Sequence, residues 1–330
     1  MWHKPLHNRT KLLRLIADGE LHSGEALGNT LGISRTAIWK IINSLSHYGV
    51  TIAAVKGKGY RLSRPMEFLD REILLSGISS STKKILNKLE LFEEIESTNQ
   101  YLLENLQGSD KHGNVVLAEY QTHGRGRRDS TWISPFGSGL CLSARWHFEQ
   151  PLDSLACLSL AVGSAVIRVL EKMGFEGVGL KWPNDIFFQN RKLGGLLIET
   201  RGETAGPCDV VIGMGLNIAF PVDFEANINQ PWIDLVSIKD PVPSRNVIAA
   251  ELISELMLLL DAYAETDARD IINEWQKYDC MRGKLAKLIL PDKNITGQVV
   301  GVDNDGALLM SVNDNVRKFT AGEISLRAES

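Results

Sequence analysis

The residues best suited to chemistry lie in one short run, Gly-Arg-Gly-Arg-Arg at 124–128. Glycine lets a backbone approach a ligand closely, and the planar arginine side chain pairs with phosphate or carboxylate through two parallel hydrogen bonds. This composition favours neither a helix nor a strand. The run therefore predicts a loop that closes over an anionic substrate. On these residues alone, a solvated basic turn is the alternative.

Two further groups place charged side chains at close spacing. In Lys-Trp-Pro-Asn-Asp at 181–185, Lys181 could bind a phosphate and Asp185 a metal ion. Lys192 precedes Gly194-Gly195, where the backbone permits close approach of a ligand. The alternatives are a Lys–Asp pair on a tight turn and a solvated lysine on a hairpin.

A third group, Ser97-Thr98-Asn99, stands between a predicted strand and a predicted helix. Small polar side chains and the free N–H groups of a helix N-terminus could bind a ligand together. Plain capping is the preferred interpretation of these three residues, because Ser, Thr and Asn are all favoured at helix starts.

Several common sites are excluded. The chain has no G-x-x-x-x-G-K phosphate loop, and neither Gly124-Arg-Gly nor Gly213-Met-Gly has the third glycine of a dinucleotide fingerprint. The four cysteines, at 141, 157, 208 and 280, form no C-x-x-C pair, which argues against zinc and for a reduced cytoplasm. The longest apolar runs are too short to cross a bilayer, and the first residues do not form a signal peptide.

The elements that position these groups are predicted from hydrophobic periodicity. Strands are expected at 91–95, 115–120, 139–146, 178–182, 186–188, 196–199 and 209–212, and helices at 100–106, 152–173, 245–264 and 268–278. Their irregular spacing favours an α+β domain with a mixed sheet over a doubly wound parallel sheet. After Gly283, four short strands separated by Asn, Asp and Gly turns predict a small SH3-like barrel.

The first 64 residues form a basic portion. They contain ten Lys/Arg and three Asp/Glu, a formal charge of +7, so the remaining residues carry −11 of the total of −4. A small basic module joined to a larger acidic one predicts that the first module binds a polyanion. A solubilising basic face is the alternative.

Within this portion the pattern predicts a helix-turn-helix at about 24–43. Ser23 and Ser34 can each cap a helix, and Gly32 can form the turn between them. The second helix, expected to reach about Tyr48, would turn polar residues outward towards DNA. With the cap Ser34, these candidates for DNA contact are Arg35, Thr36, Trp39, Lys40 and Asn43.

Strands at 50–55 and 60–62 predict a wing with Lys56 and Lys58 at its tip, where both could bind phosphates. A three-helix interaction module is the alternative to a DNA-binding winged helix.

Taken in order, these motifs resemble those of bifunctional biotin–protein ligases that also repress the biotin operon. The resemblance covers nearly the whole chain, and the arginine run followed by Lys-Trp-Pro-Asn-Asp is its most specific part. It is carried by Gly-Lys-Gly-Tyr (57–60), Ser-Thr-Asn-Gln-Tyr-Leu-Leu (97–103), Ala-Glu-Tyr-Gln (118–121), Gly-Arg-Gly-Arg-Arg (124–128), Ser-Pro-Phe-Gly (134–137), Lys-Trp-Pro-Asn-Asp (181–185), Arg-Lys-Leu-Gly-Gly (191–195), Gly-Met-Gly-Leu-Asn (213–217) and Gly-Glu-Ile-Ser-Leu-Arg (322–327).

The resemblance implies a winged helix-turn-helix at 1–64, a biotin- and ATP-binding catalytic domain at 65–279 with a mixed sheet of the class II synthetase type, and an SH3-like barrel at 280–330. Biotin and ATP, with Mg²⁺, would give biotinyl-5′-adenylate, which then acylates a lysine of a biotin carboxyl carrier protein of acetyl-CoA carboxylase. It further implies a cytoplasmic protein with no membrane association that forms a homodimer on binding the adenylate. The dimer would then occupy operator DNA and repress biotin synthesis genes.

Residue roles also follow from the resemblance. Biotin would be bound by Ser97, Thr98, Asn99, Gln121, Arg125, Gly126, Arg127 and Lys192. ATP and the adenylate would be bound by Arg127, Arg128, Lys181, Asn184, Asp185, Asn217 and Trp232, with Asp185 at the metal. Arg127, Lys181 and Lys192 would be catalytic, because attack of a carboxylate on an α-phosphate brings two anions together and needs cations.

One departure from the family pattern affects the arginine run. In the family it is usually followed by Gly-Arg or Gly-Lys, whereas Asp129-Ser130-Thr131 precedes Trp132 here. A carboxylate could pair with one of the arginines and weaken retention of the adenylate.

Two other functions stay open. One is a lipoate-ligase-like enzyme, against which the winged helix and the arginine loop argue. The other is a catalytically impaired biotin-sensing transcription factor, against which the intact Arg125, Arg127, Lys181 and Lys192 argue.

Overall fold

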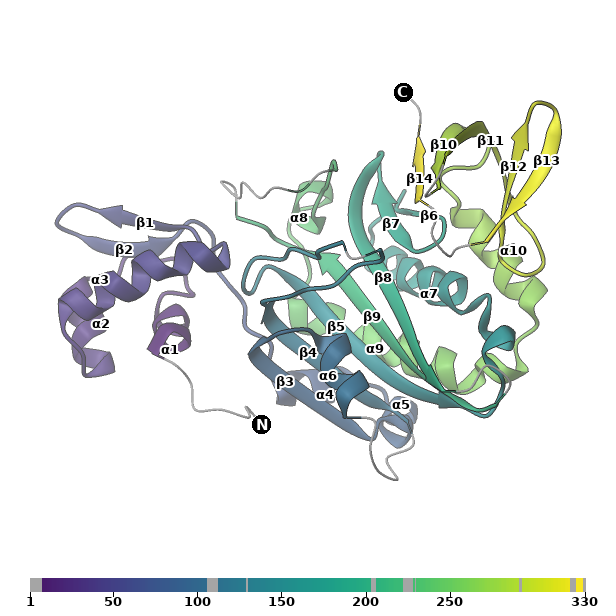
Figure 1. Cartoon of the computed structure of the whole chain (residues 1–330). Coiled ribbons are helices and arrows are strands. Elements are labelled where there is room, and N and C mark those ends of the chain that lie inside the picture. Colours follow the sequence, from purple (N-terminus) through teal and green to yellow (C-terminus); the bar gives the residue numbers. More distant parts are fainter. Residues whose placement is uncertain are drawn as a thin grey trace.

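The computed structural model of the 330-residue chain describes residues 8–105, 112–128, 130–202, 206–221, 228, 230–290, 293–320 and 325–328. Figure 1 shows a winged helix, a central mixed sheet flanked by helices, and a small C-terminal antiparallel sheet, in that order along the chain. The predicted fold class is confirmed.

The winged helix begins with α1 (Asn8–Leu15), α2 (Gly24–Leu31) and α3 (Arg35–Ser44). Ser23 and Ser34 cap α2 and α3 as expected, each accepting a hydrogen bond from a backbone N–H three residues on. Gly32 makes the turn in the left-handed region, at φ 67°. A hairpin of β1 (Ile52–Val55) and β2 (Gly59–Leu62) forms the wing.

The expectation that the third helix continues to Tyr48 is wrong in its last turn. The α-helix ends at Ser44, and residues Leu45–Tyr48 form the 3₁₀ turn η1. The hydroxyls of Ser44 and Ser46 donate to the carbonyls of Ile41 and Asn43, at 2.7 and 2.9 Å. Such local bonds compete with the regular helix ladder, so the helix tightens before Gly49 ends it.

Two short helices follow the wing, α4 (Arg71–Gly77) capped by Asp70 and α5 (Ser80–Ile85) capped by Ser79. The central sheet has the strand order β3-β4-β5-β9-β8-β7-β6. Its strands are β3 (Lys88–Ile95), β4 (Asn114–Gln121), β5 (Gly139–Phe148), β9 (Cys208–Asn217), β8 (Arg191–Gly202), β7 (Asp185–Phe188) and β6 (Gly179–Lys181). Only β3 and β4 are parallel within the described residues, so the sheet is mixed.

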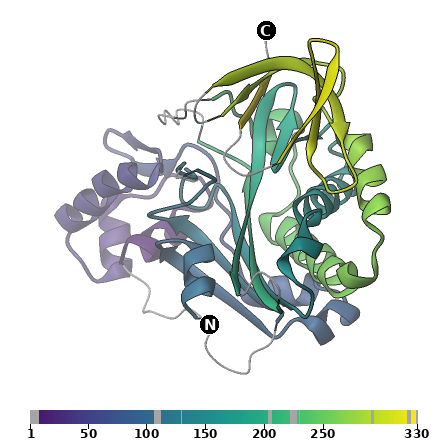
Figure 2. The same ribbon diagram turned by 45° about the vertical axis from the view of Figure 1, so that its right-hand side comes forward.

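Different helices pack on the two faces of the central sheet. The helices α7 (Leu158–Lys172), α9 (Arg245–Ala262) and α10 (Ala268–Tyr278) lie on one side of it (Figure 2). Leu140 and Leu142 of β5 face these helices in the main core, while Ser143 faces the other side, as period-two alternation predicts. The helix α6 (Thr98–Glu104) packs on that second face, against Val116 and Val211. The short helices η2 (Leu152–Leu155), α8 (Leu235–Ile238) and η3 (Tyr263–Glu265) connect these elements.

By length and composition, Leu152–Lys172 could cross a membrane, and it is the one described helix that could. In this structure 67% of the apolar window is buried inside the protein, as in the core helix of a folded domain.

The C-terminal sheet has the strand order β13-β12-β11-β10-β14 and is antiparallel throughout. Its strands are β10 (Leu285–Ile289), β11 (Asn294–Val302), β12 (Leu308–Val312), β13 (Asn315–Phe319) and β14 (Ser325–Ala328). A register shift between Val299 and Gly301 bends β11, as expected of a small, strongly curved sheet.

Candidate active site

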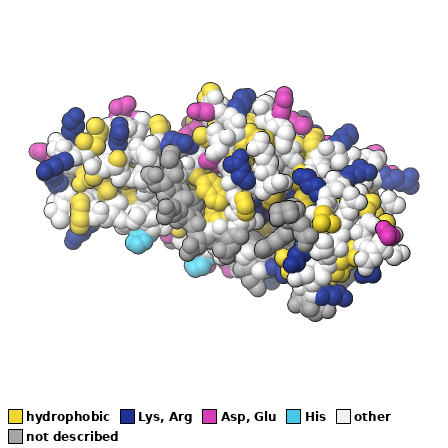
Figure 3. Space-filling view, turned by 90° about the horizontal axis from the view of Figure 1, so that it is seen from above, with side chains coloured by type: hydrophobic (Ala, Val, Ile, Leu, Met, Phe, Trp, Pro, Cys, Tyr) yellow, Lys and Arg dark blue, Asp and Glu magenta, His cyan; other side chains and the backbone are white. Residues whose placement is uncertain are grey.

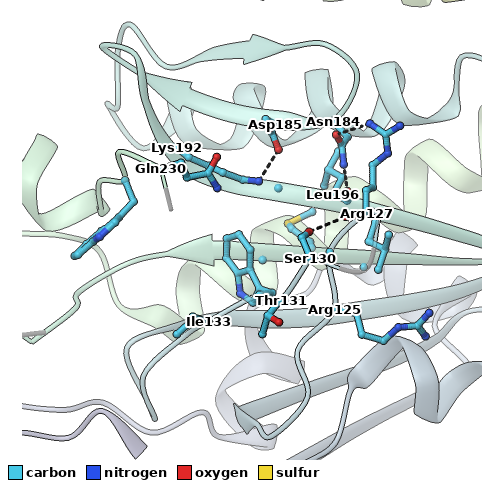
Figure 4. A pocket seen from close by; sticks show the side chains of 18 of the residues that line it. Arg125, Arg127, Ser130, Thr131, Ile133, Asn184, Asp185, Lys192, Leu196 and Gln230 are labelled. Atoms are coloured by element: carbon cyan, nitrogen blue, oxygen red, sulfur yellow. Dashed lines mark hydrogen bonds and ion pairs between the residues drawn. The ribbon is translucent and has the colours of Figure 1, made fainter. Parts of the chain in front are cut away.

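A cleft of about 1030 Å³ lies on the α6 face of the central sheet, beneath the arginine run (Figure 4). Its lining contains every residue predicted to bind a small ligand: Ser97, Thr98, Asn99, Gln121, Arg125, Gly126, Arg127, Arg128, Lys181, Asn184, Asp185, Lys192, Asn217 and Trp232. These residues come from segments up to about 130 positions apart, and the sheet brings them together.

The floor of the cleft is a network of neutral polar side chains. The backbone N–H and the hydroxyl of Thr98 both donate to Gln121 Oε1, at 2.8 and 3.1 Å. The buried Ser143 hydroxyl lies 2.7 Å from Thr98 Oγ1 and 2.5 Å from Asn99 Oδ1. Ser97 accepts from the backbone of Gln100 and is therefore a cap, as the preferred interpretation holds. Thr98 and Asn99 do more than cap, because their side chains form a buried surface of donors and acceptors suited to an uncharged polar ring.

Two glycines of β9 make room for this floor. A Cβ on Gly213 would lie 2.2 Å from Asn99 Oδ1, and a Cβ on Gly215 would lie 2.3 Å from the Trp132 ring. Both positions therefore require glycine for steric reasons at ordinary backbone angles. The Gly-Met-Gly motif thus provides space, and it does not bind phosphate in a dinucleotide turn.

The arginine run forms a narrow lid over this floor. Trp132 N donates to Gly124 O at 2.9 Å and Gly126 N to Ser130 O at 2.7 Å, so the chain turns back on itself. Arg125 leaves the turn towards Gln100 Oε1 at 2.8 Å and Glu199 Oε1 at 2.7 Å.

Arg127 reaches the other wall of the cleft, where it donates to Asn184 Oδ1 at 3.3 Å (Figure 4). Burial lowers the pKa of the Arg127 guanidinium and the carboxylate of Asp185 opposes this change, so the side chain keeps its charge.

The cationic end of the cleft is built by a tight hairpin. Residues Gln189 and Asn190 take positive φ angles of 47° and 62°, as a two-residue hairpin turn requires. This turn places Lys192 Nζ 2.7 Å from Asp185 Oδ1, while Lys181 Nζ lies 3.8 Å from Asp185 Oδ2. The pairing interpretation of these residues is therefore confirmed. The three side chains also line the cleft, and their binding of a ligand stays a prediction.

Asp185 is the one predicted metal ligand. Among the described residues, no three His, Cys, Asp or Glu side chains gather as a metal site. A single carboxylate is nevertheless enough for Mg²⁺ that arrives bound to phosphates, because such ions are held mainly by substrate oxygens and water.

The remaining wall carries Asn217 and Trp232. Asn217 Nδ2 donates to Ile233 O at 3.0 Å, and Lys192 N donates to Pro231 O at 2.9 Å. The Trp232 ring lies 5.0 Å from the Phe220 ring, which gives this end of the cleft an aromatic surface.

Several residues that line the cleft are not among the predicted site residues, namely Trp132, Ser143, Gly213, Gly215 and Met281. The alternation along β5 placed Ser143 on one face but could not show that this face is a cleft. The prediction that concerns Asp129 falls outside the residues that the structure describes.

The predicted DNA-contact residues lie on one surface of the winged helix. Arg35, Thr36, Trp39, Lys40 and Asn43 are exposed on α3, as are Lys56 and Lys58 on the wing. The Ser34 hydroxyl accepts from Ala37 N at 3.2 Å, so it caps the helix. Figure 3 shows dark blue basic side chains over this end of the molecule, on the left.

The central cleft combines a neutral polar floor with clustered cations, as an enzyme that activates an anion requires. Together with the winged helix and the small barrel, it defines a DNA-binding protein fused to such an enzyme. Profiles of three families match in this order: "HTH domain" at 8–61, "Biotin/lipoate A/B protein ligase family" at 91–217 and "Biotin protein ligase C terminal domain" at 286–327.

Similar proteins match along nearly their whole length. "Bifunctional ligase/repressor BirA" of Escherichia coli (strain K12) is 41% identical over 96% of this chain and 97% of that protein. The protein of the same name from Bacillus subtilis (strain 168) is 27% identical over 94% and 95%. The structure of biotin protein ligase from Aquifex aeolicus in complex with biotin and ATP is 26% identical, with a TM-score of 0.64 over 74% of this chain and all of that one. The chain belongs to the family of bifunctional biotin–protein ligases and repressors.

Proposed function

We propose that the protein activates biotin with ATP, transfers it to a lysine of a biotin carrier protein, and represses biotin synthesis genes when it holds the adenylate. The observation that carries the proposal is the cleft, in which a neutral polar floor leads to a cluster of cations under one lid. The family membership and the solved relative with biotin and ATP support it.

In the first step, the biotin ring system occupies the floor of Thr98, Asn99 and Gln121, with Ser97 at the helix start. Its carboxylate then points to Lys192 and Arg127, next to the α-phosphate of ATP. Attack of the carboxylate oxygen on phosphorus forms an acyl phosphate and releases pyrophosphate. Lys181, Lys192 and Arg127 offset the negative charge that builds up, so the reaction needs no protein nucleophile.

ATP lies towards Asn217 and Trp232, which receive the adenine, with Arg128 and Asn184 near the phosphates. Asp185 would hold Mg²⁺ bound to the triphosphate, and the ion would neutralise phosphate charge there. Lys192, whose Nζ lies 2.7 Å from Asp185 Oδ1, stands beside this position.

In the second step, a lysine amine of the carrier attacks the acyl carbon and AMP leaves. The adenylate is a reactive mixed anhydride, so water must be kept away until the carrier arrives. Gly126 allows the lid of Arg125, Arg127 and Arg128 to close over it.

The repressor function requires a two-fold dimer, and β8 offers an edge for one. β8 pairs with β9 along 194–202 but with β7 only along 191–195. After Leu196, whose N–H donates to Asn184 O at 2.9 Å, the second edge of β8 has no strand partner within the described residues. Such edges pair readily with another chain. Glu199 on this edge binds Arg125 of the lid, so closure of the lid on the adenylate changes the dimer surface.

The partners of the protein are a biotin carboxyl carrier protein, operator DNA and a second copy of the chain, and the protein works in the cytoplasm. Ser34, Arg35, Thr36, Trp39, Lys40 and Asn43 face the major groove, with Lys56 and Lys58 on the phosphates. The proposed domains are 1–64, 65–279 and 280–330, and this division is supported by the end of β2 at Leu62 and the start of β10 at Leu285.

The test uses purified protein, ATP, Mg²⁺, a carrier domain and labelled biotin. Label on the carrier lysine, with AMP and pyrophosphate formed in equal amounts, is the expected result, and lipoate in place of biotin should give none. Label transfer from lipoate would establish the lipoate-ligase-like alternative. A protein that binds biotin and DNA but forms no pyrophosphate would be a sensor only.

A further inference from the structure

The exposed stripe of α3 has an ordered arrangement of side chains. At roughly 100° per residue along a helix, Arg35 and Lys40 lie at the two margins of the stripe. Trp39 and Asn43 lie between them, opposite the buried face that carries Ile38. Cations at both margins match phosphates on the two sides of a groove, so the middle of the stripe faces base edges.

Trp39 is the aromatic residue in the middle of this stripe, and 53% of its surface is exposed. Tryptophan is enriched at interfaces, where a partner covers the apolar ring and the N–H finds a hydrogen-bond acceptor. Its one polar group, Nε1–H, donates and cannot accept, so it cannot read the amino groups of adenine or cytosine. The large apolar ring can instead pack against the one apolar group in the major groove, the 5-methyl of thymine.

We propose that Trp39 sets the sequence preference of the protein by packing against a thymine methyl group in each operator half-site. The inference rests on the DNA-binding function proposed above and identifies the thymine methyl group as the base feature that the protein recognises. Arg35 and Lys40 position the helix on the backbone, and Trp39 discriminates between bases.

The test selects binding sites from a random duplex library with the full-length protein in the presence of biotin and ATP. The wild type is expected to yield a two-fold site with a fixed thymine in each half. Trp39→Ala should lose the preference at that position and keep the remainder of the site. Gel shifts then compare the selected site with one in which that dT is replaced by dU, which removes only the methyl group.

For the wild type, dU should weaken binding about fourfold per half-site, the effect of one methyl group leaving an apolar contact. Trp39→Ala should bind the dT and dU sites equally. Trp39→Phe, which keeps an apolar ring, should still prefer dT. The matched control, Lys40→Ala, should bind all sequences more weakly, with a salt slope smaller by about one, and should still discriminate dT from dU.

Equal binding of dT and dU sites by the wild type would overturn the proposal, as would an unchanged selected site for Trp39→Ala. A wild type that selects no sequence at all overturns the DNA-binding function itself, which is a different result. Thermal unfolding of each variant shows whether the winged helix remains folded.

Discussion

At the scale of single residues, the shape of the cleft depends on two glycines, which have no side chain, as much as on the polar residues of its floor. Gly213 and Gly215 leave room for Asn99 and Trp132, which a methyl group at either position would strike. The strand β9 lies in the middle of the sheet and cannot move away without disturbing both neighbours.

The first prediction concerns Gly213. Gly213→Ala should raise the Kd for biotin at least tenfold, because Asn99 must shift and sub-ångström placement of the floor decides binding. Isothermal titration with biotin measures this, and the KM for ATP, which binds at the other end of the cleft, should change little. An unchanged biotin affinity would show that Asn99 is not part of the floor that binds biotin.

The second prediction concerns Asp129, whose charge follows directly on Arg127 and Arg128 in the chain. Asp129→Gly should slow dissociation of the adenylate severalfold, since it removes one carboxylate that can compete with the adenylate for the arginines. Stopped-flow fluorescence of the preformed complex gives the dissociation rate. Asp129→Asn is the matched variant: if it behaves as the wild type, the backbone and not the charge controls the lid.

At the scale of elements, the C-terminal sheet supports the turn that carries Lys181. Trp182, 2% exposed, donates from Nε1 to Gly306 O at 3.0 Å in the turn between β11 and β12. That turn is fixed by Asp303 Oδ1, which accepts from the N–H groups of Asp305 and Ala307, both at 2.9 Å. The barrel therefore positions Trp182 and with it the neighbouring Lys181.

The third prediction follows from this contact. Trp182→Phe keeps most of the ring and removes the donor, so the loop should loosen and the KM for ATP should rise severalfold. The Kd for biotin should stay as in the wild type. Trp275→Phe, a substitution at another buried indole, on α10, should lower Tm without a selective change in the KM for ATP. Parallel effects of the two substitutions on both substrates would refute a positioning role for Trp182.

At the scale of the whole molecule, the winged helix packs against the central sheet and against Phe136, which follows the arginine run. Phe136 is fully buried in the core of the winged helix, and its N–H donates to Tyr48 O at 2.9 Å. The rings of Tyr48 and Tyr120 meet at 4.8 Å, and Arg9 forms an ion pair with Glu94. Tyr120 precedes Gln121 of the floor, so one set of contacts joins the DNA-binding module to the biotin site.

The fourth prediction tests the contact between the winged helix and the central domain. Phe136→Ala should lower the free energy of unfolding by about 3 kcal/mol, the usual cost of a buried phenylalanine, and should expose the linker after Leu62. Limited proteolysis should then cleave near residues 63–66 faster than in the wild type. Phe92→Ala, which loosens the packing of α6 on the sheet, should destabilise the protein without faster cleavage near residues 63–66.

The sequence by itself determined the helix-turn-helix, the glycine–arginine loop and the lysine-bearing turns. Each depends on local rules: Ser23 and Ser34 as caps, Gly32 as a turn, and glycine with arginine where regular structure is disfavoured. The strand centres also followed from alternation, although β8 and β9 extend several residues beyond the predicted ranges. A strand ends where its neighbour stops pairing, and one sequence segment does not contain that information.

Only the tertiary structure decided what these local pieces do together. The sheet order brings Thr98, Ser143 and Gly213 from three separate elements into one floor. It sets Lys181 and Lys192 on opposite sides of Asp185, and it turns Trp182 towards the barrel. These contacts join residues far apart in the chain, and their positions depend on packing across the whole core rather than on the preferences of neighbouring residues.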